Sequence, residues 1–275
     1  MRLRTPSHAL SVLATLALAL VAPVRARAQL AVLSNLVEER TASRGERYAG
    51  KITVKNTTGQ QQTARIYQTD FRFAADGTSH TDDPGSSPRS NARWVHPQMT
   101  RLSLPPGAEI TVPYAVDVPA SDSLRGTYWS MIMIEGTGTP ASIVAAARGG
   151  AVGVGIGTVM RYAIQIATHI GATGNRMVQF TGVNAVRNPD GTAAMNLDVV
   201  NTGERGYRPT LWIEVYDANG ALRAKGRQVR GLLYPGTSLR QHYDLGALPS
   251  GNYKALIFAD TGIEPVFASQ LALVF

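Results

Sequence analysis

Apolar and polar residues alternate with a period of two along most of the chain. In 51–55, 110–114 and 211–216 an apolar residue recurs at every second position. This is the period of a half-buried β-strand, and no segment after residue 28 shows the 3.6-residue period of an amphipathic helix. The runs are short and are bounded by the turn dipeptides Asp76-Gly77, Pro106-Gly107, Asp190-Gly191, Asn219-Gly220 and Pro235-Gly236. The pattern predicts an all-β sandwich or barrel.

The turn signals occur twice in the same order. The first series is Asn56-Thr57-Thr58-Gly59, Asp76-Gly77, Pro106-Gly107 and Gly126-Thr127-Tyr128, and the second is Asn201-Thr202-Gly203, Asn219-Gly220, Pro235-Gly236 and Gly251-Asn252-Tyr253. Two tandem immunoglobulin-like sandwiches, of about seven strands and about 100 residues each, explain this order. The first copy carries an extra segment, 74–93, which its Ser, Asp, Pro and Gly content predicts to be a polar loop. We expect domains at 29–172 and 173–275.

Residues 1–28 have the pattern of a secretory signal peptide. A basic start, MRLRTPSH, precedes the apolar run ALSVLATLALALVAPV and the small-residue site Ala26-Arg27-Ala28. The run of about 16 residues is short for a membrane span, which needs about 20. We therefore expect cleavage before Gln29, no integral membrane segment afterwards, and a location in the periplasm, at the cell surface or outside the cell.

The charge of the chain changes once this segment is removed. The full sequence has 27 basic and 19 acidic residues, a net charge of +8. Without Arg2, Arg4, Arg25 and Arg27, 23 basic residues remain against 19 acidic ones, a net of +4. No run of Lys and Arg is interleaved with aromatic residues, so the sequence gives no reason to expect nucleic-acid binding.

Catalytic and metal-binding patterns are lacking in the sequence. The chain has no cysteine, which excludes thiol catalysis and cysteine-ligated metals, and it contains no G-x-S-x-G. His80, His96, His169 and His242 show no metal-ligand spacing, and Asp82-Asp83 is more typical of a solvated turn than of a cation site. We expect a protein that is not an enzyme and that uses no cofactor and no metal.

The segment 149–170, GGAVGVGIGTVMRYAIQIATHI, decides between several functions. Its glycines do not have the G-x-G-x-x-G spacing of a dinucleotide loop, and no helix pattern follows. Arg148 and Arg161 bracket only 12 uncharged residues, too few for a membrane helix. A β-strand remains, with one face apolar at even positions from 152 to 170.

Such a strand would extend about 60 Å, more than one sandwich covers. We expect 152–156 to project beyond its own sheet or to bend at Gly157. A long apolar edge invites aggregation unless a strand pairs with it, which suggests a partner. The alternative is a long interdomain strand buried within its own chain.

The segment 92–136, ARWVHPQMTRLSLPPGAEITVPYAVDVPASDSLRGTYWSMIMIEG, resembles the core of periplasmic pilus-assembly (PapD-like) chaperones. A P-rich strand, an L-x-L-x-P-G turn, a strand ending in Pro and a hydrophobic strand follow in the order of that family. An apolar loop and a long strand then lead into a second immunoglobulin-like domain. The resemblance covers about 140 residues and is weaker beyond the long strand.

The resemblance implies two sandwiches and a long strand that is lent to an incomplete partner domain. The side chains implied to fill the partner's groove are Val152, Val154, Ile156, Met160, Tyr162 and Ile164. It also implies a basic pair in the interdomain cleft that holds the partner's terminal carboxylate, for which Arg161 is one candidate. The first strand offers no second member, because 29–39 contains no Arg or Lys.

Two functions therefore stay open. The first is an exported chaperone-like protein that binds envelope or surface protein subunits by strand donation from 152–170. The second is a tandem immunoglobulin-like scaffold or adhesion protein that binds cell-wall polymer or a neighbouring surface protein, its long strand being purely structural.

Overall fold

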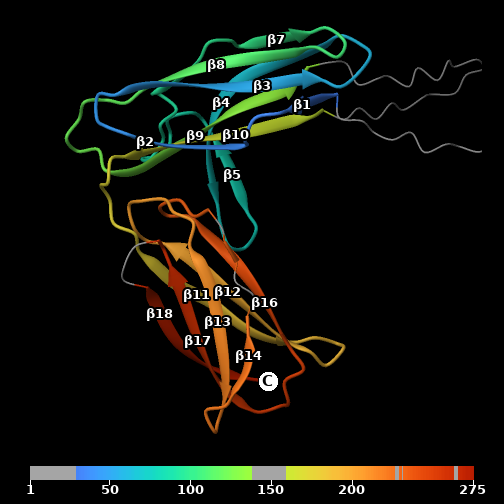
Figure 1. Ribbon diagram of the computed structural model, residues 1–275, viewed down its shortest axis with the longest axis vertical. Coiled ribbons are helices and arrows are strands. Elements are labelled where there is room, and N and C mark those ends of the chain that lie inside the picture. Colours follow the sequence, from blue (N-terminus) through green and yellow to red (C-terminus); the bar gives the residue numbers. More distant parts are fainter. Residues whose placement is uncertain (1–28, 138–158, 227–228, 231, 263–265) are drawn as a thin grey trace, which may run out of the picture.

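The computed structural model describes residues 29–137, 159–226, 229–230, 232–262 and 266–275. Over these ranges the chain forms β-strands arranged in two sandwiches, one above the other in Figure 1. No helix in the described ranges is long and apolar enough to cross a membrane. The predicted all-β class with two tandem sandwiches is confirmed for this part of the chain.

The first sandwich contains strands β1 to β10. One sheet has the order β1-β3-β8-β6, and the other has the order β2-β10-β9-β4-β5, with β7 also paired to β4. The strands are β1 (Leu30–Val32), β2 (Val37–Ala42), β3 (Arg47–Asn56), β4 (Gln62–Phe73), β5 (Ser79–Asp82), β6 (Val95–Pro97), β7 (Arg101–Leu104), β8 (Glu109–Asp117), β9 (Gly126–Gly136) and β10 (Arg161–Ile170).

The second sandwich contains strands β11 to β18. One sheet has the order β11-β12-β16, and the other has the order β14-β13-β17-β18, with β15 paired to β13. The strands are β11 (Val178–Arg187), β12 (Ala193–Asn201), β13 (Thr210–Asp217), β14 (Leu222–Lys225), β15 (Val229–Arg230), β16 (Ser238–Gly246), β17 (Asn252–Asp260) and β18 (Phe267–Val274).

Each sandwich encloses its own apolar core, built from the alternating positions of the sequence. The side chains of Ile52 and Val112 are fully buried between the two sheets of the first sandwich, as are those of Leu211 and Ile213 in the second. The glycines of the five predicted turn dipeptides all have positive φ angles, between 70° and 86°. Glycine adopts this conformation without steric cost, so these turns fix where each strand ends.

The segment 74–93 differs from the predicted polar loop. Part of it forms β5, which pairs with the end of β4 in a hairpin that points toward the second sandwich (Figure 1). The backbone N–H of Ala75 donates to Ser238 Oγ at 2.9 Å, and Phe73 packs against the core of the second sandwich. The prediction of a loop was wrong because polar composition alone does not reveal that part of the segment pairs with the end of β4.

Aromatic stacking joins the two sandwiches. The rings of Trp129 on β9 and Tyr234 are stacked, with centroids 4.6 Å apart, and both side chains are buried. The Tyr234 hydroxyl donates to Gln165 Oε1 on β10 at 3.0 Å. Close backbone contact adds to this, because a Cβ atom on Gly126, whose φ is +75°, would lie 1.9 Å from the carbonyl oxygen of Glu204. Only glycine fits at this point of the junction.

The described part of the long strand is shorter than the sequence predicts. β10 begins at Arg161, and Val159 and Met160 precede it without strand pairing, although the Gly136 N–H donates to the Met160 carbonyl at 3.0 Å. The predicted strand residues 152–158 lie outside the described residues. The predicted strand 152–170 is therefore not continuous, because Val159 and Met160 are not part of a strand.

We expect Ile164→Asp to destabilise the first sandwich by more than about 3 kcal/mol, because it places a carboxylate in a fully buried apolar site. Ile164→Val, which removes one methylene group, should cost about 0.5–1.5 kcal/mol. Urea unfolding followed by tryptophan fluorescence measures both. An unchanged midpoint for Ile164→Asp would contradict the placement of this side chain.

Candidate strand-pairing edge

The N-terminal segment 30–42 passes from one sheet to the other, as β1 in the first sheet and β2 in the second. Leu30–Val32 pairs with β3 in one sheet, whereas Val37–Ala42 pairs in parallel with β10 in the other. Between them, the Leu33 N–H and the Ser34 Oγ still bond to the backbone of Thr53 on β3. The segment 33–36 thus crosses the edge of the sandwich, and β10 receives its neighbour only from Gln165 onward.

The first part of β10 consequently has a free edge. β9 pairs with β10 along Arg161–Ile170, but no described strand pairs with Arg161–Ile164 on the opposite side. The N–H of Gln165 points to that side, where it donates to the Leu36 carbonyl at 2.8 Å. Because backbone direction alternates along a strand, the N–H and C=O groups of Arg161 and Ala163 point to the same side. These groups form a template on which another strand can pair.

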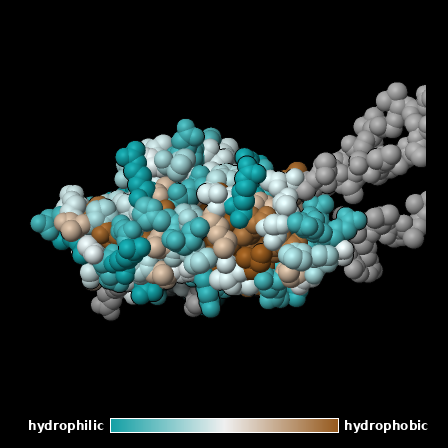
Figure 2. Space-filling view, turned by 90° about the horizontal axis from the view of Figure 1, so that it is seen from above, coloured by the Kyte–Doolittle hydropathy of each residue, from teal (hydrophilic) through white to brown (hydrophobic). Residues whose placement is uncertain are grey.

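Exposed apolar side chains lie along the crossing segment and at the start of the long strand. Leu33, Leu36 and Val159 are 53%, 50% and 52% exposed. Seen from above, the first domain is mostly hydrophilic, and apolar residues gather toward the end that carries β1 (Figures 1 and 2). Apolar side chains in water beside unpaired backbone are typical of a protein interaction site.

The structure separates the predicted partner-binding residues into two groups. Val152, Val154 and Ile156 lie outside the described residues. Met160 and Tyr162 are described and are both half-buried.

Ile164 and Tyr162 face the core of their own sandwich rather than a partner. The Ile164 side chain is fully buried there, and the Tyr162 ring packs against the same core while its hydroxyl donates to the Leu30 carbonyl at 2.6 Å. The predicted role of Ile164 and Tyr162 in filling a partner's groove is therefore wrong, because both side chains already contact the core of their own sandwich. Ile164 does lie on the apolar face that the sequence predicts, but at this position the core of its own sandwich covers that face.

Arg161 belongs to an ion-pair cluster around Glu135. The Arg161 Nε donates to Glu135 Oε2 at 2.8 Å, the Tyr67 hydroxyl donates to the same oxygen at 2.7 Å, and Arg65 Nη2 donates to Oε1 at 3.0 Å. These hydrogen bonds, with that from Tyr67 the largest cause, lower the pKa of Glu135 to about 2. The bond to Glu135 raises the pKa of Arg65 above its usual value. The Glu135 carboxylate is thus ionised at neutral pH.

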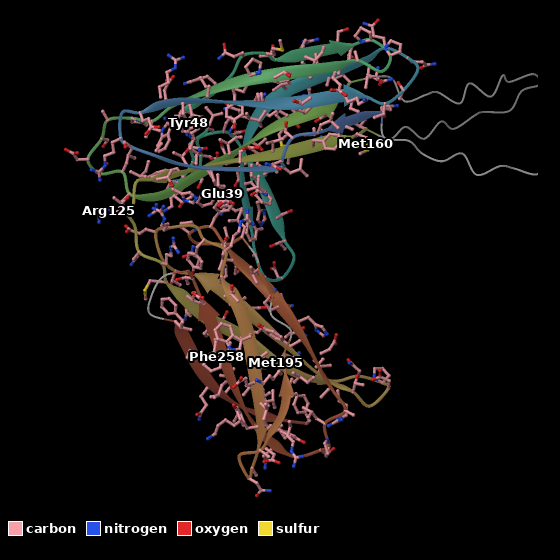
Figure 3. All side chains as sticks on the ribbon, in the orientation of Figure 1. Glu39, Tyr48, Arg125, Met160, Met195 and Phe258 are labelled. Atoms are coloured by element: carbon pink, nitrogen blue, oxygen red, sulfur yellow. The ribbon has the colours of Figure 1, made fainter. Side chains whose placement is uncertain are left out.

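Arg161 does not lie in the interdomain cleft. Met160, its neighbour, lies at the opposite end of the first domain from Arg125, which is beside the connection to the second domain (Figure 3). Arg161 lies nine positions before Ile170 along β10, a distance of about 30 Å. The carboxylate-anchoring role in the cleft, implied by the resemblance, is therefore not met by Arg161.

The junction between the domains holds a different charged cluster, which sequence reasoning missed. Arg208 of the second sandwich forms an ion pair with Glu39 on β2, and His169 Nε2 lies 3.6 Å from the same carboxylate. The contact with His169 is the largest cause that lowers the pKa of Glu39, the charge and hydrogen bond of Arg208 add to it, and burial opposes it. No local signal could reveal this cluster, because its members are far apart in the sequence.

No metal site is evident in the described ranges. These ranges contain no group of three or more His, Asp or Glu side chains placed to hold an ion. His169 Nδ1 instead bonds to Thr127 Oγ1 at 2.7 Å, and Thr127 Oγ1 accepts the Gly206 N–H at 2.8 Å. The histidine therefore takes part in joining the domains.

No family model matches the chain, and no curated protein matches it. The solved structures that match include many fimbrial chaperones of the PapD-like family that the sequence resembles.

Three of these structures illustrate the degree of similarity. A chaperone–tip adhesin complex of CFA/I fimbriae biogenesis matches with 14% identity and a TM-score of 0.47, over 88% of this chain and 98% of that chain. The CsuC–CsuE chaperone–tip adhesion subunit complex of Acinetobacter baumannii Csu pili has 12% identity, a TM-score of 0.44 and coverage of 89% and 98%. The E. coli chaperone DraB has 13% identity, a TM-score of 0.41 and coverage of 88% and 98%. Similarity this low says nothing about what the present chain binds.

Proposed function

We propose that this chain is an exported, non-enzymatic, chaperone-like protein that binds envelope or surface protein subunits by strand pairing at β10. The observation that carries the proposal is the free edge at Arg161–Ile164, which exists because the segment 30–42 changes sheets. The N-terminal domain, 29–172, is the partner-binding domain in this proposal. Residues 152–158 would continue the edge toward the partner.

The chemistry of the edge favours a polypeptide as partner. The N–H and C=O groups of Arg161 and Ala163 that pair with no described strand are satisfied best by the backbone of another strand. The exposed Leu33 and Leu36 beside the edge would lose their contact with water when a partner covers them. Backbone pairing supplies affinity, and apolar contact adds to it.

Export follows from the N-terminal segment. The proposed signal peptide would direct the chain to the periplasm or the cell surface, where envelope subunits pass after translocation. The mature protein contains no cysteine, so its fold does not depend on the redox state of that compartment.

A second candidate function rests on the second sandwich. Trp212 and Phe258 stack on its outward face with centroids 5.1 Å apart, and Tyr216 lies on the same face of β13. Tyr216 also lines a hollow of about 540 Å³, together with Lys254 and Gln270 among others. Aromatic rings beside polar groups favour polymer or protein binding, as a cell-envelope scaffold would need.

Ala163→Pro tests the proposed strand pairing. The Ala163 N–H points to the free edge, so proline removes a donor there without removing a bond to β9. We expect the variant to fold and to lose most capture of envelope proteins from a periplasmic extract, read by mass spectrometry. Ala163→Val keeps the N–H and should capture as the unmodified chain does. Equal capture by Ala163→Pro would contradict the proposal.

Val154→Asp tests the extension of the edge. In the proposal this residue faces the partner's groove, so a charge there should abolish capture while the urea midpoint stays unchanged. If Val154→Asp captures the same proteins as the unmodified chain, the proposed extension of the edge is wrong and pairing is confined to β10.

Trp212→Ala tests the second candidate. We expect sedimentation of the chain with purified insoluble cell-wall polymer to fall at least about fivefold if the aromatic face binds it. Trp212→Phe keeps a ring and serves as the control. Absence of sedimentation for the unmodified chain would remove this candidate.

A further inference from the structure

Four charged residues form one row across the sheet that contains β10. Arg101 on β7 is in register with Arg65 on β4, Arg65 with Glu135 on β9, and Glu135 with Arg161 on β10. Residues directly opposite each other on antiparallel strands point to the same face, and the contacts of Glu135 with both Arg65 and Arg161 agree with this. The row ends at Arg161, where the sheet has its free edge.

The row carries more positive than negative charge. Three arginines share one carboxylate, which leaves a surplus of two positive charges. Both oxygens of Glu135 already accept hydrogen bonds, from Tyr67, Arg65 and Arg161. Arg101 is exposed and has no acidic partner within the described ranges. The row would therefore gain from another carboxylate and would be destabilised by another cation.

Arg161 retains donors for such a carboxylate. Its Nε bonds to Glu135 at 2.8 Å, and neither of its Nη groups bonds to a described residue. Its side chain is 56% exposed. A guanidinium group presents its N–H donors in a planar fork that fits the two oxygens of a carboxylate.

A strand that pairs with the free edge would place one residue directly opposite Arg161. The Cβ atoms of such a pair lie about 4.5–5.5 Å apart, and both side chains point to the same face. An Asp or Glu at that position would reach the free Nη groups of Arg161 and lengthen the row by one member. A Lys or Arg at that position would instead be repelled by the surplus positive charge of the row.

We propose that Arg161 selects partner strands that carry Asp or Glu directly opposite it. The inference rests on the proposed strand pairing and adds to it the chemistry and register of the partner. A polypeptide is favoured over an anionic polymer, because the backbone N–H and C=O of Arg161 pair with no described strand and lie next to its side chain. A single strand that carries an acidic residue can bond both to the backbone and to the side chain of Arg161.

Synthetic peptides test this selection directly. The probe is a fluorescent peptide of alternating Val and Thr with Ser at both ends and a single central Glu, together with matched peptides that have Gln or Lys in its place. We expect the exported chain to bind the Glu peptide about fivefold more tightly than the Gln peptide, and the Lys peptide most weakly. Fluorescence anisotropy measures all three affinities.

Two variants make the test specific. Arg161→Glu should reverse the order, so that the Lys peptide binds most tightly. Arg72→Gln is the matched control, because Arg72 is also 56% exposed and ion-paired to one acid, Asp82, and it should leave the order unchanged. Thermal unfolding checks that both variants fold.

The outcomes distinguish this inference from the function on which it rests. Equal binding of the Glu and Gln peptides, with both lost in Ala163→Pro, would overturn the acidic preference and leave strand pairing intact. Peptide binding that is absent, or that Ala163→Pro does not reduce, would overturn both. Binding of polyphosphate that depends on Arg161 but not on Ala163→Pro would assign Arg161 to an anionic polymer and overturn the inference.

Discussion

The change of sheet by the segment 30–42 is the constraint on which the proposed binding edge depends. If the segment 30–42 paired only with β3, β10 would have no parallel neighbour. If it paired only with β10, it would cover the whole edge of β10. Here, Leu30–Val32 closes the sheet of β3, and Val37–Ala42 covers β10 only from Gln165 onward. The uncovered part keeps a folded core behind it, because Ile164 is fully buried and the Tyr162 hydroxyl bonds to Leu30. The edge is therefore held against a packed core before any partner arrives, which lowers the entropy lost on binding.

The second sandwich is fixed against the first by contacts of several kinds. The stack of Trp129 on Tyr234 is apolar and buried, whereas the ion pair of Glu39 with Arg208 is partly open to water. The hairpin of β4 and β5 adds a contact from a third direction through Ala75. Contacts spread around a junction in this way restrict rotation of one domain against the other. The second domain thus keeps a defined position relative to β10.

Charge and backbone act together at the free edge. Arg161 supplies backbone groups that pair with no strand in the described part of the chain and, through its side chain, the last member of a charged row across four strands. Backbone pairing alone tolerates almost any strand, because its hydrogen bonds do not depend on the side chains. A charged residue at the end of the ladder adds a preference for partner and register at little cost in stability, since it remains exposed.

The sequence alone determined the class of the fold. The period of two at Ile52, Val112 and Leu211 is set by strand geometry, and the turn glycines are set by steric limits on φ, so both are local properties. The tertiary structure decided which face of each strand remained available. The apolar parity of 160–170 predicts a face but not its neighbour, and Ile164 lies in its own core because the opposite sheet covers it. The free edge, the cluster of Glu39 with Arg208 and the row that ends at Arg161 all arise from pairing between residues distant in the chain, and local periodicity contains no information on such pairing.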